Sequence, residues 1–204
     1  MDSFERDAFD RGNRFVAGVD EAGRGPLAGP VVAGAVVFEF PPPIGLGIRD
    51  SKKLTPSRRA SLVLDIYRTA VAVGVGIVWP GDVDRLNIHR ASLLAMEKAV
   101  RGLGPPDGGF KPDFILIDGA FRTSLDIPQL PVVSGDSLSV SIAAASIIAK
   151  TARDAIMEAY HRIYPHYGFP GNKGYPTKGH RAALSTFGPC PIHRKSFRLS
   201  LKQD

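Results

Sequence analysis

The sequence predicts an α/β fold, namely a mixed sheet with helices on its faces. Apolar and β-branched runs of strand length recur along the chain, and segments with helical periodicity lie between them. Chains with this alternation fold as a sheet covered by helices. The length of 204 residues and the hydrophobic content of 44% fit one domain with a sizeable core.

The first half of the chain is expected to contain three strands and two helices. An apolar run at 15–19 and a continuous β-branched run at 31–38 predict the first two strands, and glycines alternating with branched residues at 71–79 predict the third. Thr55 and Pro56 have the residue types favoured at an N-cap and a first helical position, so a helix is expected over 56–69. An apolar stripe predicts a second helix over about 83–101.

The second half is expected to contain two short strands and two helices. The apolar run at 113–117 predicts a fourth strand, and 132–133 is a candidate fifth. The segment 139–163 is nearly all apolar as far as Ala149, so we expect it to be the buried central helix. Beyond residue 164, proline and glycine break the chain into short pieces, with one helix near 178–187.

The net charge of +6 is concentrated at the C-terminal end of the chain. Residues 161–204 carry eight Lys or Arg and one acidic residue, with aromatic side chains between them. We therefore divide the chain into a core at 1–163 and a basic, mostly helical region at 164–204 of the same compact unit. This pattern is typical of a nucleic-acid-binding surface, although a solvated basic face explains the charge equally well.

Composition excludes several other classes of protein. No apolar run has the length that spans a membrane, and the polar N-terminus at 1–14 is unlike a secretory signal. Cys190 is the single cysteine, so no internal disulfide can form. We therefore expect a cytoplasmic protein with no membrane partner.

Three carboxylates lie where predicted strands end, which is where open α/β sheets place their sites. They are Asp20, Glu21 and Asp118. Adjacent side chains of a regular strand point to opposite faces, so Asp20 and Glu21 can share a site only at a strand end or bulge. The glycines that follow them provide such an irregularity. A strand that ends in a polar turn is the simpler alternative for either position.

A fourth carboxylate is expected from one end of the helix at 139–163. Asp136 precedes this segment and Asp154 lies 18 residues later in its body, about 27 Å away at the helical rise, so only one of them can join the cluster. We choose Asp136 because Gly135 lets its loop turn, and we interpret Asp154 as an exposed or ion-paired residue. Four carboxylates without Cys or His favour two Mg²⁺ or Mn²⁺ ions, which clamp a phosphoryl displacement.

Several stretches resemble bacterial ribonuclease HII, the type 2 ribonuclease H, over about residues 15 to 198. They are Gly18-Val19-Asp20-Glu21-Ala22-Gly23-Arg24-Gly25, Asp50-Ser51-Lys52-Lys53-Leu54, Asp118-Gly119, Ser141-Ile142-Ala143-Ala144-Ala145-Ser146-Ile147-Ile148-Ala149-Lys150, Arg153-Asp154 and Gly174-Tyr175-Pro176-Thr177. The resemblance implies a ribonuclease-H-like fold and a metal site formed by Asp20, Glu21, Asp118 and Asp136. It also implies that the turn Gly23, Arg24 and Gly25 recognises the 2′-hydroxyl at the cleavage site. Tyr175 matches a tyrosine that abuts the neighbouring sugar.

The expected activity is metal-dependent cleavage of RNA in RNA–DNA hybrids, or at a ribonucleotide embedded in duplex DNA, leaving 5′-phosphate and 3′-hydroxyl ends. Six basic residues are candidate phosphate contacts: Lys52, Lys53, Lys178, Arg181, Arg194 and Lys195. The role of His180 is left open between assisting product release and a structural or phosphate-facing one.

Two alternatives stay open at this point, namely another nuclease of the same fold, such as a junction resolvase, and a non-catalytic RNA-binding module. We expect no further domain before Asp20, which argues against the type 3 relative. No sliding-clamp peptide is recognised near the C-terminus, and we expect a monomer.

Overall fold

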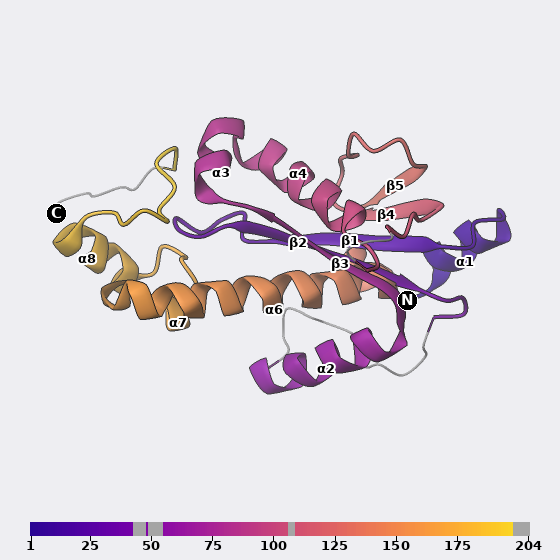
Figure 1. Ribbon diagram of the computed structural model, residues 1–204, viewed down its shortest axis with the longest axis horizontal. Coiled ribbons are helices and arrows are strands. Elements are labelled where there is room, and N and C mark those ends of the chain that lie inside the picture. The colour runs from indigo at the N-terminus through magenta and orange to yellow at the C-terminus, as the bar shows by residue number, and fades with distance from the viewer. Residues whose placement is uncertain (43–47, 49–54, 106–108, 198–204) are drawn as a thin grey trace.

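The computed structural model describes residues 1–42, 48, 55–105 and 109–197. Five strands form one sheet in the order β3-β2-β1-β4-β5 (Figure 1). They are β1 (Val16–Ala22), β2 (Val31–Phe38), β3 (Ala70–Val78), β4 (Phe114–Asp118) and β5 (Gln129–Val132). The first three strands pair antiparallel, whereas β4 runs parallel to both β1 and β5. The predicted mixed sheet is therefore confirmed.

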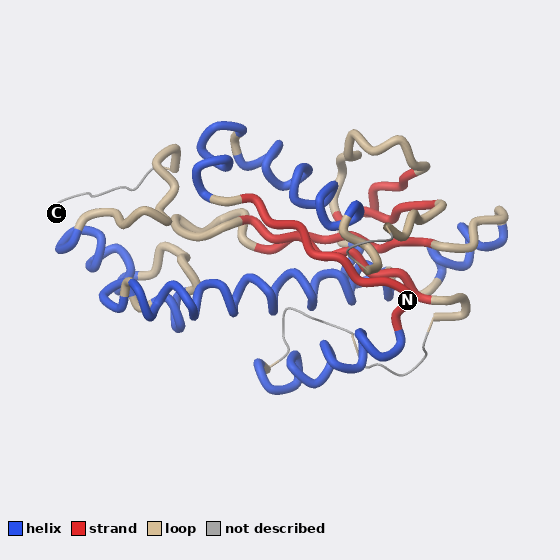
Figure 2. Tube along the Cα trace, viewed as in Figure 1, coloured by secondary structure: helices blue, strands red, loops and turns tan. Residues whose placement is uncertain are grey.

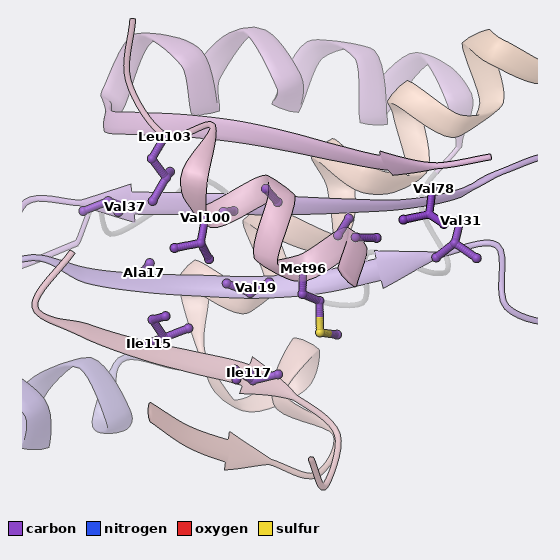
Figure 3. Packing of buried hydrophobic residues seen from close by; sticks show 14 of the residues in the cluster. Ala17, Val19, Val31, Val37, Val78, Met96, Val100, Leu103, Ile115 and Ile117 are labelled. Carbon is purple, nitrogen blue, oxygen red and sulfur yellow. The ribbon is translucent and has the colours of Figure 1, made fainter. Parts of the chain in front are cut away.

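Helices cover both faces of this sheet (Figure 2). One face packs against α6 (Val140–Ile163), with α2 (Pro56–Thr69) beside it, and the other packs against α4 (Ile88–Arg101) with α3 (Pro80–Leu86). Figure 3 shows the cluster on the α4 side, where Ala17, Val19 and Ile117 meet Met96 and Val100. A second buried cluster fills the space between the sheet, α2 and α6. The long apolar segment is thus the central helix that was predicted.

Glycines let the helices approach the sheet backbone. A Cβ at Gly18 would lie 2.1 Å from the Ser141 carbonyl carbon, and one at Gly34 would lie 2.4 Å from the Ala145 carbonyl oxygen. On the other face, a Cβ at Gly76 would lie 2.0 Å from the Ala95 carbonyl oxygen. Such separations are far inside van der Waals contact. Both helices therefore pack so close to the sheet backbone that no side chain would fit at these glycine positions.

Two element predictions were wrong in their boundaries. The single helix expected over 83–101 is two helices, because Asn87 adopts a left-handed φ of 69° and its side chain caps α4 by accepting from the Arg90 amide at 3.1 Å. The fifth strand lies at Gln129–Val132 and not at 132–133. The helix over 56–69 is confirmed with Thr55 as its N-cap, and α8 (Lys178–Phe187) also coincides with its prediction.

Outside the C-terminal region, two helices were not predicted. One is α5 (Gly135–Leu138), and the other is α1 (Ser3–Asp10), which packs at the start of α6. The buried Glu5 of α1 accepts from the Ser139 hydroxyl at 2.6 Å and from the Ser141 amide at 2.9 Å. A carboxylate at a helix N-terminus satisfies free amides and complements the helix dipole. The polar N-terminal segment therefore fixes the near end of the central helix.

The C-terminal region packs on the far end of α6. After the short η2 (Pro165–Tyr167) and α7 (Phe169–Asn172), α8 leads to an irregular final segment. A separate apolar cluster joins this region to α6 through Met157, Phe169 and Leu184. None of the helices in the described ranges is long and apolar enough to cross a bilayer.

Candidate active site

Asp20 and Asp118 lie side by side because of the strand register. Val19 of β1 pairs in parallel with Ile117 of β4, so the next residue of each strand is an aspartate on the same face. Asp20 is 4% exposed and packs under α6, whose Ser146 hydroxyl hydrogen bonds to it. Both aspartates line one pocket, so the structure brings them together.

Glu21 lines the same pocket. It lies at a strand end, since β1 ends at Ala22 and its pairing with β4 ends at Val19, while the regular pairing with β2 shows no bulge there. The Glu21 side chain is 7% exposed and pairs with Arg24 at 3.1 Å between Nη1 and Oε1. Its other oxygen, Oε2, is buried and has no hydrogen-bond partner among the described residues.

The electrostatics of these carboxylates are unfavourable as they stand. Burial raises the pKa of Asp20 well above its ordinary value, and the charges of Glu21 and Asp118 raise it further. Burial also raises the pKa of Glu21. The guanidinium of Arg24 opposes this rise, and the charge of Asp118 adds to it. A site that buries several like charges is suited to a cation.

The donor set fits a hard divalent cation. Asp20, Glu21 and Asp118 offer only oxygen ligands, and the partnerless Oε2 of Glu21 is an acceptor that a cation would satisfy. Within the described part of the chain, however, no group of three or more Asp, Glu, His or Cys side chains already has the spacing of a metal site. The side chains would therefore have to close on the cation when it binds.

Asp136 lies next to this cluster and does not line its pocket. It is 9% exposed on α5, and the amide of the preceding Gly135 donates to Asp118 at 2.7 Å. Its place as the fourth ligand stays a prediction. Asp154 is ion-paired as expected, with Arg59 at 3.3 Å and Lys150 at 2.5 Å, and it is mostly buried and not exposed.

The turn after the carboxylates forms another wall of the pocket. Gly23, Arg24 and Gly25 line it together with Tyr175, whose ring lies 3.5 Å from the position of a Cβ on Gly25. Gly23 has a φ of +96°, which side chains rarely adopt, and its missing Cβ leaves room for Arg153. The ring of Tyr175 is 45% exposed, so it can meet a ligand that enters the pocket.

The candidate phosphate contacts divide into three groups. Lys178, Arg181 and Lys195 are exposed, so a phosphate can reach them. Lys52 and Lys53 lie outside the described residues. Arg194 is wholly buried, and its guanidinium donates to the carbonyls of Gly23, Arg24 and Gly29, so the prediction that it contacts phosphate is wrong.

His180 is structural, which answers the question that the sequence left open. It is buried, with Nδ1 2.9 Å from the Tyr175 carbonyl and Nε2 3.0 Å from Nε2 of His193. The Tyr175 carbonyl can only accept, so His180 Nδ1 carries a proton and donates to it. In a neutral ring His180 Nε2 is then an acceptor, and His193 Nε2 donates to it. His193 Nδ1 then accepts from the Cys190 amide at 3.0 Å. Burial lowers the pKa of His180, and that of His193 to about 4, so both rings stay neutral.

Sequence reasoning missed three residues that shape this site: Ser146, Arg153 and His193. Ser146 lies within a quoted motif, and only its helical position below β1 shows that it reaches Asp20. Arg153 directly precedes Asp154 and was passed over with it, although it is 1% exposed and lines the pocket. No local pattern marks His193, because its partners come together only in the folded tail.

Comparisons with known proteins agree on one family. A family model described as Ribonuclease HII matches residues 17–200. Ribonuclease HII of Syntrophus aciditrophicus is 54% identical over 202 residues, which cover 98% of this chain and 91% of that protein. The solved ribonuclease H2 from Pyrococcus horikoshii OT3 has a TM-score of 0.76 at 27% identity, covering 91% of this chain and 94% of the other. Bst-RNase HIII in complex with Mn²⁺ has a TM-score of 0.65 at 23% identity, covering 88% and 63%, which shows the fold alone.

Proposed function

The chain belongs to the ribonuclease HII family, and from that premise we propose that its active site for cutting RNA consists of Asp20, Glu21, Asp118 and Asp136. It is a ribonuclease H, a hydrolase that cleaves RNA in RNA–DNA hybrids and depends on a divalent metal. The observation that carries the choice of residues is the pocket itself, which places Asp20 and Glu21 beside Asp118, where burial and the charge of Asp118 raise the pKa of both.

Each of the three carboxylates that line the pocket has a distinct role in this proposal. Asp20 and Asp118 are neighbouring ligands whose orientation is fixed from outside, Asp20 by Ser146 and Asp118 by the Gly135 amide. Glu21 brings its partnerless oxygen to the same place. These residues would hold divalent cations, which would supply Lewis-acid activation of a water and neutralisation of the charge on the leaving 3′-oxygen. The products are a 5′-phosphate and a 3′-hydroxyl.

The oxygen-only donor set supports Mg²⁺ or Mn²⁺ as the cofactor. A titration of cleavage rate with each metal separately tests this choice. Saturable activation by Mg²⁺ and by Mn²⁺, with none by Zn²⁺ at equal concentration, is the expected result. Activation by Zn²⁺ alone would contradict the proposed donor chemistry.

The substrate of the pocket is proposed to be a single ribonucleotide within a duplex, as well as a continuous hybrid. The turn Gly23-Arg24-Gly25 supplies backbone amides at the pocket wall, and a 2′-hydroxyl is the group that distinguishes RNA from DNA. Tyr175 would abut the next sugar. Lys178, Arg181 and Lys195 are exposed cations that can follow the phosphates.

Three duplexes of one sequence test this function. The first contains one ribonucleotide, the second has a complete RNA strand, and the third is all DNA. We expect Mg²⁺-dependent cuts on the 5′ side of the single ribonucleotide and within the RNA strand, and none in DNA. A cut in the all-DNA duplex would instead favour a nuclease that ignores the sugar, while binding without cleavage would favour an RNA-binding module.

The fourth ligand is tested with two aspartates, Asp136 before α6 and Asp154 within it. Asp136→Asn should lower turnover by orders of magnitude and raise the Mg²⁺ concentration needed for half-maximal activity. Asp154→Asn removes an ion pair with Arg59 and Lys150, so it should affect stability and leave the Mg²⁺ requirement unchanged. If the Asp154 variant were inactive and the Asp136 variant active, the fourth ligand would have to be reassigned.

The expectations of a monomer and of no sliding-clamp partner also remain proposals. The predicted lack of a clamp peptide falls largely on residues after 197, outside the described part of the chain. Size-exclusion chromatography with light scattering should give a mass near the 21.9 kDa of the chain, and a doubled mass would contradict the monomer.

A further inference from the structure

Two buried arginines lie beneath the turn that faces the substrate. Arg153 of α6 is 1% exposed and Arg194 of the C-terminal segment is fully buried. Neither forms an ion pair with a carboxylate in the described ranges. Burying a cation is costly unless other groups replace its water. The groups that replace it here are backbone carbonyls.

The two guanidinium groups bind six carbonyl oxygens, and five of these belong to the segment 23–30, here called the sugar loop. Arg153 donates to Pro30 at 3.0 Å, Ala28 at 3.1 Å and Lys173 at 3.0 Å. Arg194 donates to Gly29 at 3.0 Å, Arg24 at 3.0 Å and Gly23 at 2.6 Å. The two side chains therefore determine the direction of most peptide groups in this loop.

The direction of a carbonyl fixes the direction of the amide that follows it. In a trans peptide the C=O and the next N–H point to opposite sides. The Gly23 and Arg24 carbonyls point at Arg194, so the amides of Arg24 and Gly25 point away from it. These two amides donate to no acceptor within the described residues, and both residues line the pocket.

We propose that Arg153 and Arg194 are positioning residues for sugar discrimination: they hold the carbonyls of the sugar loop so that its amides face the 2′-hydroxyl of the substrate. The inference rests on the proposed function, in which this loop recognises that hydroxyl. It makes the planar guanidinium fork the device that orients the peptide groups of this loop. Lysine cannot replace it, because the donors of an ammonium group share one nitrogen, whereas each guanidinium here reaches three carbonyls from three separate nitrogens.

The test measures binding without divalent metal, so it does not depend on catalysis. The dissociation constants of a duplex with one ribonucleotide and of the all-DNA duplex are compared for each protein. In the wild type we expect the ribonucleotide duplex to bind roughly fivefold to tenfold more tightly, the value of about one hydrogen bond. Arg153→Lys and Arg194→Lys should bring this ratio to within about twofold of unity, with affinity for the all-DNA duplex unchanged.

Matched variants keep the outcome interpretable. Arg68→Lys changes an arginine that is 75% exposed and should retain the wild-type ratio. If either buried variant does not fold, Asp84→Asn replaces it. Asp84 accepts from the Lys195 and Ser196 amides at 2.9 Å, so it anchors the chain directly after Arg194. Asp84→Asn should lower the ratio at least twofold.

Each result decides the matter. A wild-type ratio in the lysine variants, or in Asp84→Asn where it is used, overturns the inference while leaving the proposed function intact. An equal loss of affinity for both duplexes also overturns it, because the arginines would then support the fold and not the discrimination. A ratio of unity in the wild type would remove the proposed role of the sugar loop itself, and the inference with it.

Discussion

Acidification should weaken the fold through the buried pair His180 and His193, and His193→Gln should remove most of that effect. Burial lowers the pKa of His193 to about 4 from its ordinary value of 6.5. The unfolded chain therefore takes up a proton as the pH falls through 6.5, while the folded chain resists protonation down to about 4. Stability is accordingly lost between these two values as the pH falls. The pKa of His180 is also lowered by burial, which adds an effect of the same sign.

The size of the effect follows from proton linkage. For a single histidine with these two pKa values, the free energy of unfolding falls by about 2 kcal/mol between about pH 7 and about pH 5. The carboxylates act in the opposite direction, because the raised pKa of Asp20 and Glu21 makes the folded state gain stability on acidification. The wild type alone shows only the sum of these contributions. The difference between wild type and variant isolates the histidine.

Urea denaturation of both proteins at these two pH values measures the difference. The variant should lose about 2 kcal/mol less than the wild type on acidification, even if it is less stable throughout. His166→Gln is the control, because His166 is exposed and stacks on Phe187. It should keep the wild-type pH dependence. If the wild type and His193→Gln lost the same free energy of unfolding on acidification, the argument would be refuted that burial keeps the His193 ring uncharged.

Four other predictions follow from the same structure. Asp118→Asn should abolish cleavage and hold or raise the metal-free thermal midpoint in calorimetry, because the charge of Asp118 raises the pKa of Asp20; a lower midpoint would contradict this. Gly76→Ala should cost about 1–3 kcal/mol in urea denaturation, because its Cβ would overlap the α4 backbone; unchanged stability would show that α4 can move. Glu5→Gln should cost about 1–2 kcal/mol in the same assay, since a charged acceptor is lost at the start of α6; a neutral result would show that α1 is dispensable. Lys178→Gln should make the log–log dependence of duplex affinity on salt shallower by about 0.9, and an unchanged slope would exclude a phosphate contact there.

Local signals in the sequence predicted the elements whose ends are fixed locally. Thr55 and Thr177 each accept from a backbone amide three residues later, and the helices that they cap lie where they were expected. The break at Asn87 was missed because the apolar stripe continues across it, and the left-handed backbone of one asparagine does not change the hydrophobic periodicity. The helix α1 was missed because its main contact joins Glu5 to residues 134 and 136 positions away.

The candidate site was predictable to the same degree. Asp20 and Asp118 each follow an apolar run of strand length, and this pattern predicts that both lie at strand ends, where they come together. Burial was not predictable for the basic tail. Arg194 and Lys195 are adjacent and look alike in sequence, yet one is fully buried and the other exposed. The difference depends on carbonyls more than 160 residues away, which no local pattern reports.

The contact between Arg194 and the sugar loop also bears on how the protein is made. The two are separated by 165 to 171 positions, and ribosomes deliver the chain from its N-terminus. The strands that carry Asp20 and Asp118, and the helix that supports them, are all synthesised before Arg194. Ordering a loop through so distant a partner is slow, because chain closure comes at an entropic cost before the contact forms. If Arg194 has the proposed role, a nascent chain would hold all its proposed metal-binding carboxylates before the residue that gives the sugar loop its preference is synthesised.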